Sequence, residues 1–231
     1  MGNFKPTTVS LMDYFAANIG GTPWYEILTA YYYIFSSHKN QILNTTSFGG
    51  HYFLSSPAGN TSLTNFQIED MLADAINNGT IPLSDTGVYS VMFPGYLNVS
   101  FQGKYWLRDW CSFHGAFVLG SGDTIKYSVV GDPSSAPGRS GQVCIPLGGN
   151  PTANGDPSAD NMAVGYAQQL ANIVTDGTYG GWFSDKNGLE AGSACAYNFG
   201  IDLLQSQYNV LVGSKKFLLS SVWLPLIGCV I

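Results

Sequence analysis

The sequence predicts an α/β fold in which helices cover a mixed sheet. Segments with the spacing of a buried helix face alternate along the chain with short runs of β-branched and aromatic residues, which are typical of strands. The chain has 231 residues and is 45% hydrophobic, which is enough for a substantial core. There is no internal repeat and no interdomain linker, so we expect residues 1–231 to form a single domain.

Helix boundaries in the first eighty residues are marked by their capping residues. A first helix is predicted from about residue 8 to residue 19, because a Gly-Gly pair follows it. A Thr-Pro pair at positions 22 and 23 favours the start of a second helix. Thr64 and Gln67 have the spacing of a capping box and predict a third helix that ends near residue 78.

The remaining elements follow from runs of apolar residues. Strands are predicted at about residues 48–54, 88–93, 116–119 and 125–130, with further strands or a packed tail between 217 and 227. Residues 131–158 are rich in Pro, Gly and Ser and are too many for an ordinary connection. They include Cys144, so we expect a disulfide to hold this segment. A helix is predicted at 161–176.

Composition excludes two classes of partner. The net charge is −6 and the few basic residues are scattered, which is unlike a nucleic-acid-binding surface. No apolar run reaches the ~18–20 residues that span a bilayer. Charged residues make up only 10% of the chain and aromatic residues 14%. The plainer interpretation of the aromatic residues is a Tyr-rich core and rim, and the alternatives are a surface that stacks on sugars or packs against copies of itself.

Two features favour secretion, although the first residues lack the apolar core of a signal peptide. Four N-glycosylation sequons lie in the first hundred residues, at Asn44, Asn60, Asn78 and Asn98. Four cysteines, none in a Cys-x-x-Cys motif, form an even set with three alternative pairings: Cys111, Cys144, Cys195 and Cys229. We therefore expect a secreted, extracellular glycoprotein with disulfides.

Several blocks occur in an order that resembles one protein family. They are GGTPWY at 20–25, CSFHG at 111–115, KYSVVGDP at 126–133 and LEAGSAC at 189–195. Together they resemble the EXORDIUM or phosphate-induced protein family of secreted, wall-associated proteins. The resemblance implies a link to cell expansion and growth signalling, but no biochemical activity.

The resemblance also implies a disulfide pairing. The family has two further cysteines, one just before the CSFHG block and one near residue 137, and both are absent here. Their joint absence is expected if they pair with each other. That leaves Cys111 with Cys144, and Cys195 with Cys229.

The predicted 161–176 helix carries a degenerate site. Bacterial members of the family have His-Glu where this chain has Gln168 and Gln169, and they resemble zincin metallopeptidases, which implies a degenerate zincin-like fold. In a zincin, positions 168 and 172 would bind zinc and position 169 would be the general base. Here Gln168, Gln169 and Asn172 are neutral amides, which bind zinc poorly and cannot accept a proton. We therefore expect no metal, no cofactor and no catalysis by this route.

His114 and Glu190 are the candidates for a residual site. The plainer interpretation makes His114 a hydrogen-bonded histidine near a disulfide and Glu190 a loop anchor. The leading functional hypothesis is a non-enzymatic wall or matrix glycoprotein with a structural or binding role, whose partners are cell-wall glycans. One alternative is a self-assembling filament or coat subunit. Another is a hydrolase of wall polysaccharide or peptide with an unrecognised site around His114, Asp132 and Glu190.

The start of the chain carries a last expectation. In the family, an apolar strand precedes the first helix, and residues 1–4 match only its end. The single domain is therefore expected to lack the family's first strand. Either a longer precursor supplies this strand, or a strand from a neighbouring subunit fills the vacant sheet edge.

Overall fold

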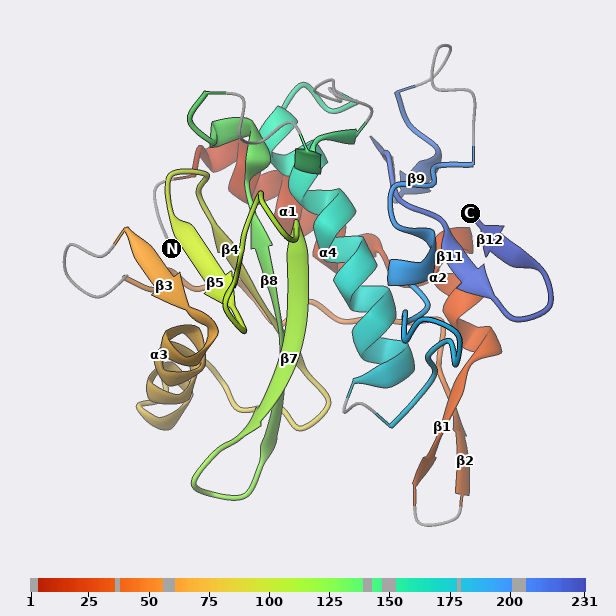
Figure 1. Cartoon of the computed structure of the whole chain (residues 1–231), viewed down its shortest axis with the longest axis horizontal. Helices are drawn as coiled ribbons and strands as arrows, with labels where there is room; N and C mark the ends of the chain where they lie inside the picture. The colour runs from red at the N-terminus through yellow and green to blue at the C-terminus, as the bar shows by residue number, and fades with distance from the viewer. Residues whose placement is uncertain are drawn as a thin grey trace.

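A three-stranded mixed sheet lies at the centre of the molecule (Figure 1). The computed structural model describes residues 4–35, 38–55, 61–138, 143–146, 153–177, 180–200 and 207–231. In the sheet, β4 (Val88–Phe93) runs parallel to the central strand β8 (Thr124–Gly131), and β7 (Ser112–Val118) runs antiparallel to β8 along the other edge. The mixed α/β class predicted from the sequence is confirmed.

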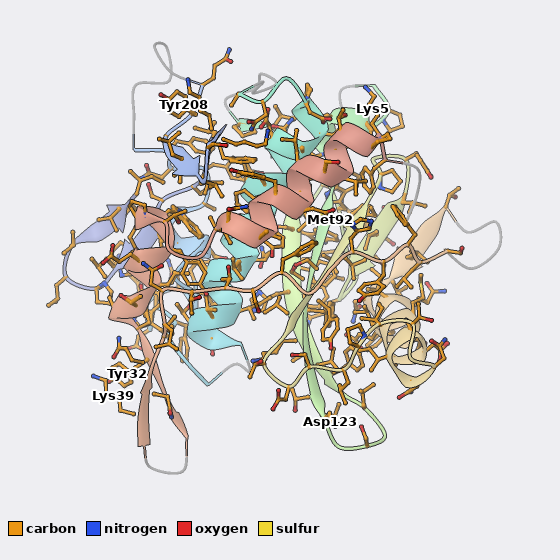
Figure 2. The ribbon with its side chains drawn as sticks, turned by 180° about the vertical axis from the view of Figure 1, so that it is seen from behind. Lys5, Tyr32, Lys39, Met92, Asp123 and Tyr208 are labelled. Atoms are coloured by element: carbon orange, nitrogen blue, oxygen red, sulfur yellow. A yellow bond between two sulfur atoms is a disulfide. The ribbon has the colours of Figure 1, made fainter. Side chains whose placement is uncertain are left out.

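One face of this sheet is covered by helices. The long helix α4 (Pro157–Asp176) packs against β8 and β7, and α1 (Pro6–Asn18) packs against α4. Figure 2 shows α1 crossing in front of α4 when the molecule is seen from behind. The core between these elements contains fully buried aromatic side chains, among them Phe15, Trp24 and Phe217.

The opposite face carries a second core. There α3 (Asn65–Asn77) lies beside a small sheet in which β5 (Asn98–Phe101) pairs with β3 (Ser62–Thr64) in parallel and with β6 (Lys104–Tyr105) in antiparallel orientation. From left to right in Figure 1, α3 and this small sheet, the central sheet, and α4 form successive layers. The central sheet therefore separates two hydrophobic clusters.

Short elements complete the chain around α4. They are α2 (Pro23–Glu26), the 3₁₀ turns η1 (Ile27–Ala30), η2 (Pro133–Ser135) and η5 (Ser193–Cys195), and three antiparallel pairs: β1 (Tyr32–Phe35) with β2 (His38–Gln41), β9 (Val210–Val212) with β10 (Lys215–Phe217), and β11 (Val222–Leu224) with β12 (Gly228–Val230). In the described part of the chain, no helix is both long enough and apolar enough to cross a membrane.

The helices begin where local capping places them. The Thr64 hydroxyl accepts the Gln67 backbone N–H at 3.3 Å, and the Gln67 side chain accepts the Thr64 N–H at 2.9 Å, so the predicted capping box is confirmed. Helix α4 starts four residues earlier than predicted. The reason is a stronger local signal, because the Asp156 carboxylate caps the Ala159 N–H and Pro157 occupies the first turn.

The predicted strand at residues 48–54 is wrong. These residues form no strand, and Phe48 and Phe53 are 40% and 66% exposed. The segment is held to the first helix instead, through a contact of 2.8 Å between His51 Nδ1 and Asp13 Oδ2. A strand needs a neighbour to pair with, and within the described residues no strand pairs with this segment. A Gly-Gly pair at 49 and 50 weakens it further.

Both implied disulfides are present, Cys111–Cys144 and Cys195–Cys229. They join residues 33 and 34 positions apart, a loop length worth ~3–4 kcal/mol each on the chain-entropy model. The first holds part of the long Pro/Gly/Ser segment against the start of β7. The second ties η5 to β12. The sequon at Asn60 lies outside the described residues, as do residues 1–3 of the segment 1–4 that was expected to match the end of the family's first strand; Phe4 is described and is not in a strand.

The fold ranks the remaining sequons by exposure. Asn78 and Asn98 are exposed, whereas Asn44 is half-buried and its side-chain oxygen accepts the Gly21 N–H at 2.9 Å. In a eukaryotic secretory host we expect high occupancy at Asn78 and Asn98 and lower occupancy at Asn44, because a glycan must project into solvent. Glycopeptide mass spectrometry measures each occupancy. Full occupancy at Asn44 with none at Asn78 would contradict this ranking.

Candidate functional site

A pocket of about 540 Å³ opens between β7, α4 and the loop that leads into η5. It is lined by Phe101, Gln102, Ser112, Phe113, His114, Gln168, Gln169, Asn172, Asp176, Phe183, Gly188, Glu190 and Ser193. The structure thus brings together all five site positions expected from the sequence. Asp132 is elsewhere: it is buried, lies outside the pocket lining, and its Oδ1 caps the Ser134 N–H of η2.

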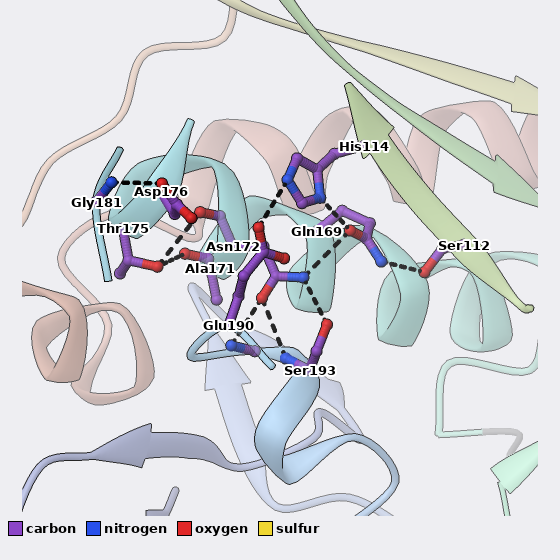
Figure 3. A network of polar contacts seen from close by, with 11 residues as sticks. Ser112, His114, Gln169, Ala171, Asn172, Thr175, Asp176, Gly181, Glu190 and Ser193 are labelled. Carbon is purple, nitrogen blue, oxygen red and sulfur yellow. Dashed lines mark hydrogen bonds and ion pairs between the residues drawn. The ribbon is translucent and has the colours of Figure 1, made fainter. Parts of the chain in front are cut away.

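Asn172 joins α4 to the loop that carries Glu190 (Figure 3). Its Oδ1 accepts the backbone N–H groups of Gly192 at 2.8 Å and Ser193 at 3.1 Å. Its Nδ2 donates to Gln169 Oε1 at 3.3 Å and to Ser193 Oγ at 2.8 Å. The side chain is 1% exposed, so all four bonds are made out of water. An amide with both ends occupied in this way acts as a clip between helix and loop.

The clip requires a glycine at position 192. A Cβ atom there would lie 2.4 Å from the Gln168 carbonyl oxygen and 2.8 Å from Asn172 Oδ1. Neither atom can move away without breaking the helix or the clip. The loop can approach α4 this closely because Gly192 has no side chain.

His114 is held between Gln169 and Glu190. Its Nδ1 lies 2.9 Å from Gln169 Oε1, and its Nε2 lies 3.2 Å from Glu190 Oε1. The Gln169 amide nitrogen donates to Ser112 Oγ at 2.8 Å, so its oxygen is the atom that faces the ring. That oxygen can only accept, and so can the Glu190 carboxylate. Both contacts are therefore satisfied together only when His114 is a doubly protonated imidazolium.

The charges in the pocket support this protonation state. Burial by itself lowers the pKa of His114, but the hydrogen bond and charge of Glu190, the hydrogen bond to Gln169 and the charge of Asp176 outweigh it, so the pKa is raised. Burial and the Glu190 charge raise the pKa of Asp176, although backbone N–H groups of the following turn partly compensate. The surroundings of His114 thus favour its imidazolium form, beside two carboxyl groups.

These residues do not fit the zinc ion of a zincin. Asn172 Oδ1 is already occupied by two N–H groups, and Gln168 and Gln169 offer only amides. Of the lining residues that can bind zinc, Glu190 and His114 are paired with each other, and Asp176 accepts the Gly181 backbone N–H. Among the described residues there is no group of three His, Cys, Asp or Glu side chains that could bind a metal ion.

Ser112 was not predicted as a site residue, and Ser193 was rejected as a nucleophile because the Gly-x-Ser-x-Gly motif is absent. A signal for Ser112 was available, because residues two apart on a strand share a face and Ser112 precedes His114 by two in β7. For Ser193, nothing in the sequence indicated a contact with the predicted 161–176 helix. It reaches the pocket through the Asn172 clip, which joins positions 21 residues apart.

Replacing Asn172 with Ala should lower the free energy of unfolding by about 2–4 kcal/mol, because it leaves the buried N–H groups of Gly192 and Ser193 without an acceptor. Chemical denaturation measures the loss. The matched control is Asn77→Ala, at an exposed position in the last turn of α3, which should change stability by less than ~0.5 kcal/mol. Equal effects of the two changes would refute the clip.

The ion pair predicts a specific pH dependence. A pKa raised above the ordinary His value of 6.5 means that folding favours the imidazolium. Its contribution to stability is therefore fully present below about pH 6.5 and is lost as the pH rises through the folded-state pKa. We expect Glu190→Gln to lower the pKa of His114 in an NMR titration. The stability difference between wild type and variant should shrink as the pH rises, and a difference that grew with pH would contradict the assignment.

Comparison with known proteins identifies one family. The model of the Phosphate-induced protein 1 conserved region matches residues 16–227. No curated protein and no solved structure matches the chain. The matched region includes the central sheet, α4 and every residue of the pocket. Because the match covers most of the 231 residues, the chain belongs to the family of the Phosphate-induced protein 1 conserved region.

Proposed function

We propose that this protein is a secreted, non-enzymatic binding protein of a cell wall or extracellular matrix, and that the pocket beside α4 binds a glycan. The observation that carries the proposal is the set of groups lining the pocket, which combines hydroxyl donors, carboxylate acceptors and aromatic rings. Pockets of this size with a few oriented polar groups are the default sites for small ligands.

The polar groups of the pocket match the hydroxyl groups of a sugar. The Oγ atoms of Ser112 and Ser193 each accept an amide hydrogen from α4, so each hydroxyl hydrogen can turn toward a ligand. Glu190 uses one carboxylate oxygen for His114 and keeps lone pairs on the other. A sugar hydroxyl both donates and accepts, and so it can satisfy both kinds of group.

Aromatic side chains supply the apolar part of the site. Phe183 lines the pocket and is 49% exposed, and Phe101 stacks on Phe113 with ring centroids 4.4 Å apart. Aromatic faces pack against the C–H groups of sugar rings. The family resemblance to secreted, wall-associated proteins points to cell-wall glycans as the ligands.

We also propose that the protein has no enzymatic activity. Amides at positions 168, 169 and 172 cannot take a proton from water near neutral pH. His114 as an imidazolium has no free lone pair, and Glu190 is engaged by it. The proposal therefore gives the pocket no general base of the zincin type.

We further propose that the fold is a degenerate zincin-like one. An antiparallel edge strand, β7, borders the cleft above α4, and α4 presents positions 168, 169 and 172 to that cleft. Glu190 enters from a downstream loop, where a third metal ligand of such an enzyme would lie. In this interpretation the Asn172 clip and the His114 ion pair stand where the metal and its ligands would be.

Extracellular location and self-association complete the proposal. Two disulfides and exposed sequons suit a secreted protein. A second candidate role, subunit of a filament or coat, is favoured by large apolar side chains in solvent, such as Phe53 at 66%, Leu43 at 69% and Ile227 at 69% exposed. Electron microscopy of the native material tests that role.

Calorimetric titration with neutral β-linked gluco-, xylo- and manno-oligosaccharides tests the binding role. We expect saturable binding without release of products and less than ~0.1 zinc per chain by elemental analysis. Ser112→Ala should weaken binding several-fold, whereas Ser121→Ala, at an exposed position outside the pocket, should not. Product release that is abolished by His114→Ala, or one zinc per chain, would replace the proposal with the hydrolase alternative.

A further inference from the structure

We propose that the pocket selects uncharged glycans and rejects glycans that carry a carboxylate, such as those containing uronic acids. This inference rests on the glycan-binding function proposed above and specifies the ligand class of the same site. It follows from the charged residues that line the pocket, and from the contacts that His114, the cationic residue among them, makes inside the protein.

The pocket offers no cationic donor to an anionic ligand. Its charged lining residues in the described part of the chain are Glu190, Asp176 and His114, and none is Lys or Arg. His114 is the one cation among them, and both of its ring nitrogens are engaged inside the protein, Nδ1 by Gln169 and Nε2 by Glu190. A carboxylate in the pocket would therefore find no N–H group of the imidazolium to bind.

The acceptors in the pocket also oppose an anion. Glu190 and Asp176 present carboxylate oxygens, which can accept a hydrogen from the ligand and have none to donate. A neutral sugar hydroxyl supplies that hydrogen, but a ligand carboxylate cannot. Two like charges in a partly enclosed site repel more strongly than in bulk water because the local dielectric constant is lower.

The serine hydroxyls do not compensate for this repulsion. Ser112 and Ser193 each have one hydrogen to donate, and each oxygen is fixed by an amide of α4. A single neutral hydrogen bond is weaker than the charge-assisted fork by which Arg binds a carboxylate. Juxtaposed like charges are one means by which proteins exclude a wrong partner.

The test compares three ligands of one backbone: a neutral β-linked glucotetraose, the same tetrasaccharide ending in glucuronic acid, and the methyl ester of that acid. The ester has the bulk of the acid without its charge. Calorimetric titration of the full chain should show comparable affinity for the neutral sugar and the ester, and at least about tenfold weaker binding of the free acid.

Two variants test whether the preference for the ester over the acid comes from charge in the pocket or from the shape of the ligand. Asp176→Asn keeps an oxygen for the backbone N–H of Gly181 and removes a carboxylate, so the preference for ester over acid should fall several-fold. Asp123→Asn removes a charge from the distant β7–β8 turn and should leave the preference unchanged. Raising the ionic strength should narrow the preference of the wild type, because salt screens charge and not shape.

Each outcome bears on a different claim. If the free acid binds as tightly as the ester, the selection by charge is wrong while glycan binding stands. If acid and ester are rejected equally, the selection is steric and the inference is again wrong. If none of the three ligands binds, and the wider set of neutral oligosaccharides also fails, the glycan-binding function itself is overturned.

Discussion

The pocket depends on one side chain, Asn172, whose four hydrogen bonds fix the distance between α4 and the loop that carries Glu190. The constraint continues along the chain, because the same loop runs into η5 and the Cys195–Cys229 disulfide ties η5 to the C-terminal hairpin. Gly192 is needed for the close approach. Without the clip, the loop would lose its side-chain hydrogen bonds to α4, and Glu190 would be positioned only by the backbone contacts of its own loop, such as the bridge between Phe183 and Glu190.

In the part of the chain that the structure describes, the pocket has two acidic groups and not three because residue 169 is an amide. A carboxylate there would accept from His114 Nδ1, as the amide oxygen does, but would add a third acid to the pocket. The Gln169 oxygen orients the His114 ring without adding a negative charge. The positive charge of the His114 imidazolium is then paired with one carboxylate, that of Glu190. In the proposed zincin-like ancestry, the proton on His114 supplies the compensation that a metal ion would otherwise give to the carboxylate.

The sequence predicted features that depend on residues close together in the chain, and it missed features that depend on residues far apart in the chain. The Thr64–Gln67 capping box spans three residues, and the helix it opens was predicted to within a residue or two. The cysteine pairs came from the family pattern. The prediction of a strand at 48–54 is wrong because strand formation depends on a partner that is distant in the sequence. The contact between His114 and Gln169 joins residues 55 apart, so the sequence indicated the candidates but not their convergence.

The polar network is better explained by binding than by stability. Burying an ion pair costs desolvation that its attraction only partly offsets, and apolar side chains of similar volume often stabilise a fold as well or better. A network built only to join β7 to α4 would have no reason to leave hydroxyl and carboxylate groups facing an open pocket. Here Ser112, Ser193 and Glu190 are each fixed from behind by a protein partner while they line the pocket. Such preorganisation lowers the cost of ordering these side chains when a ligand binds.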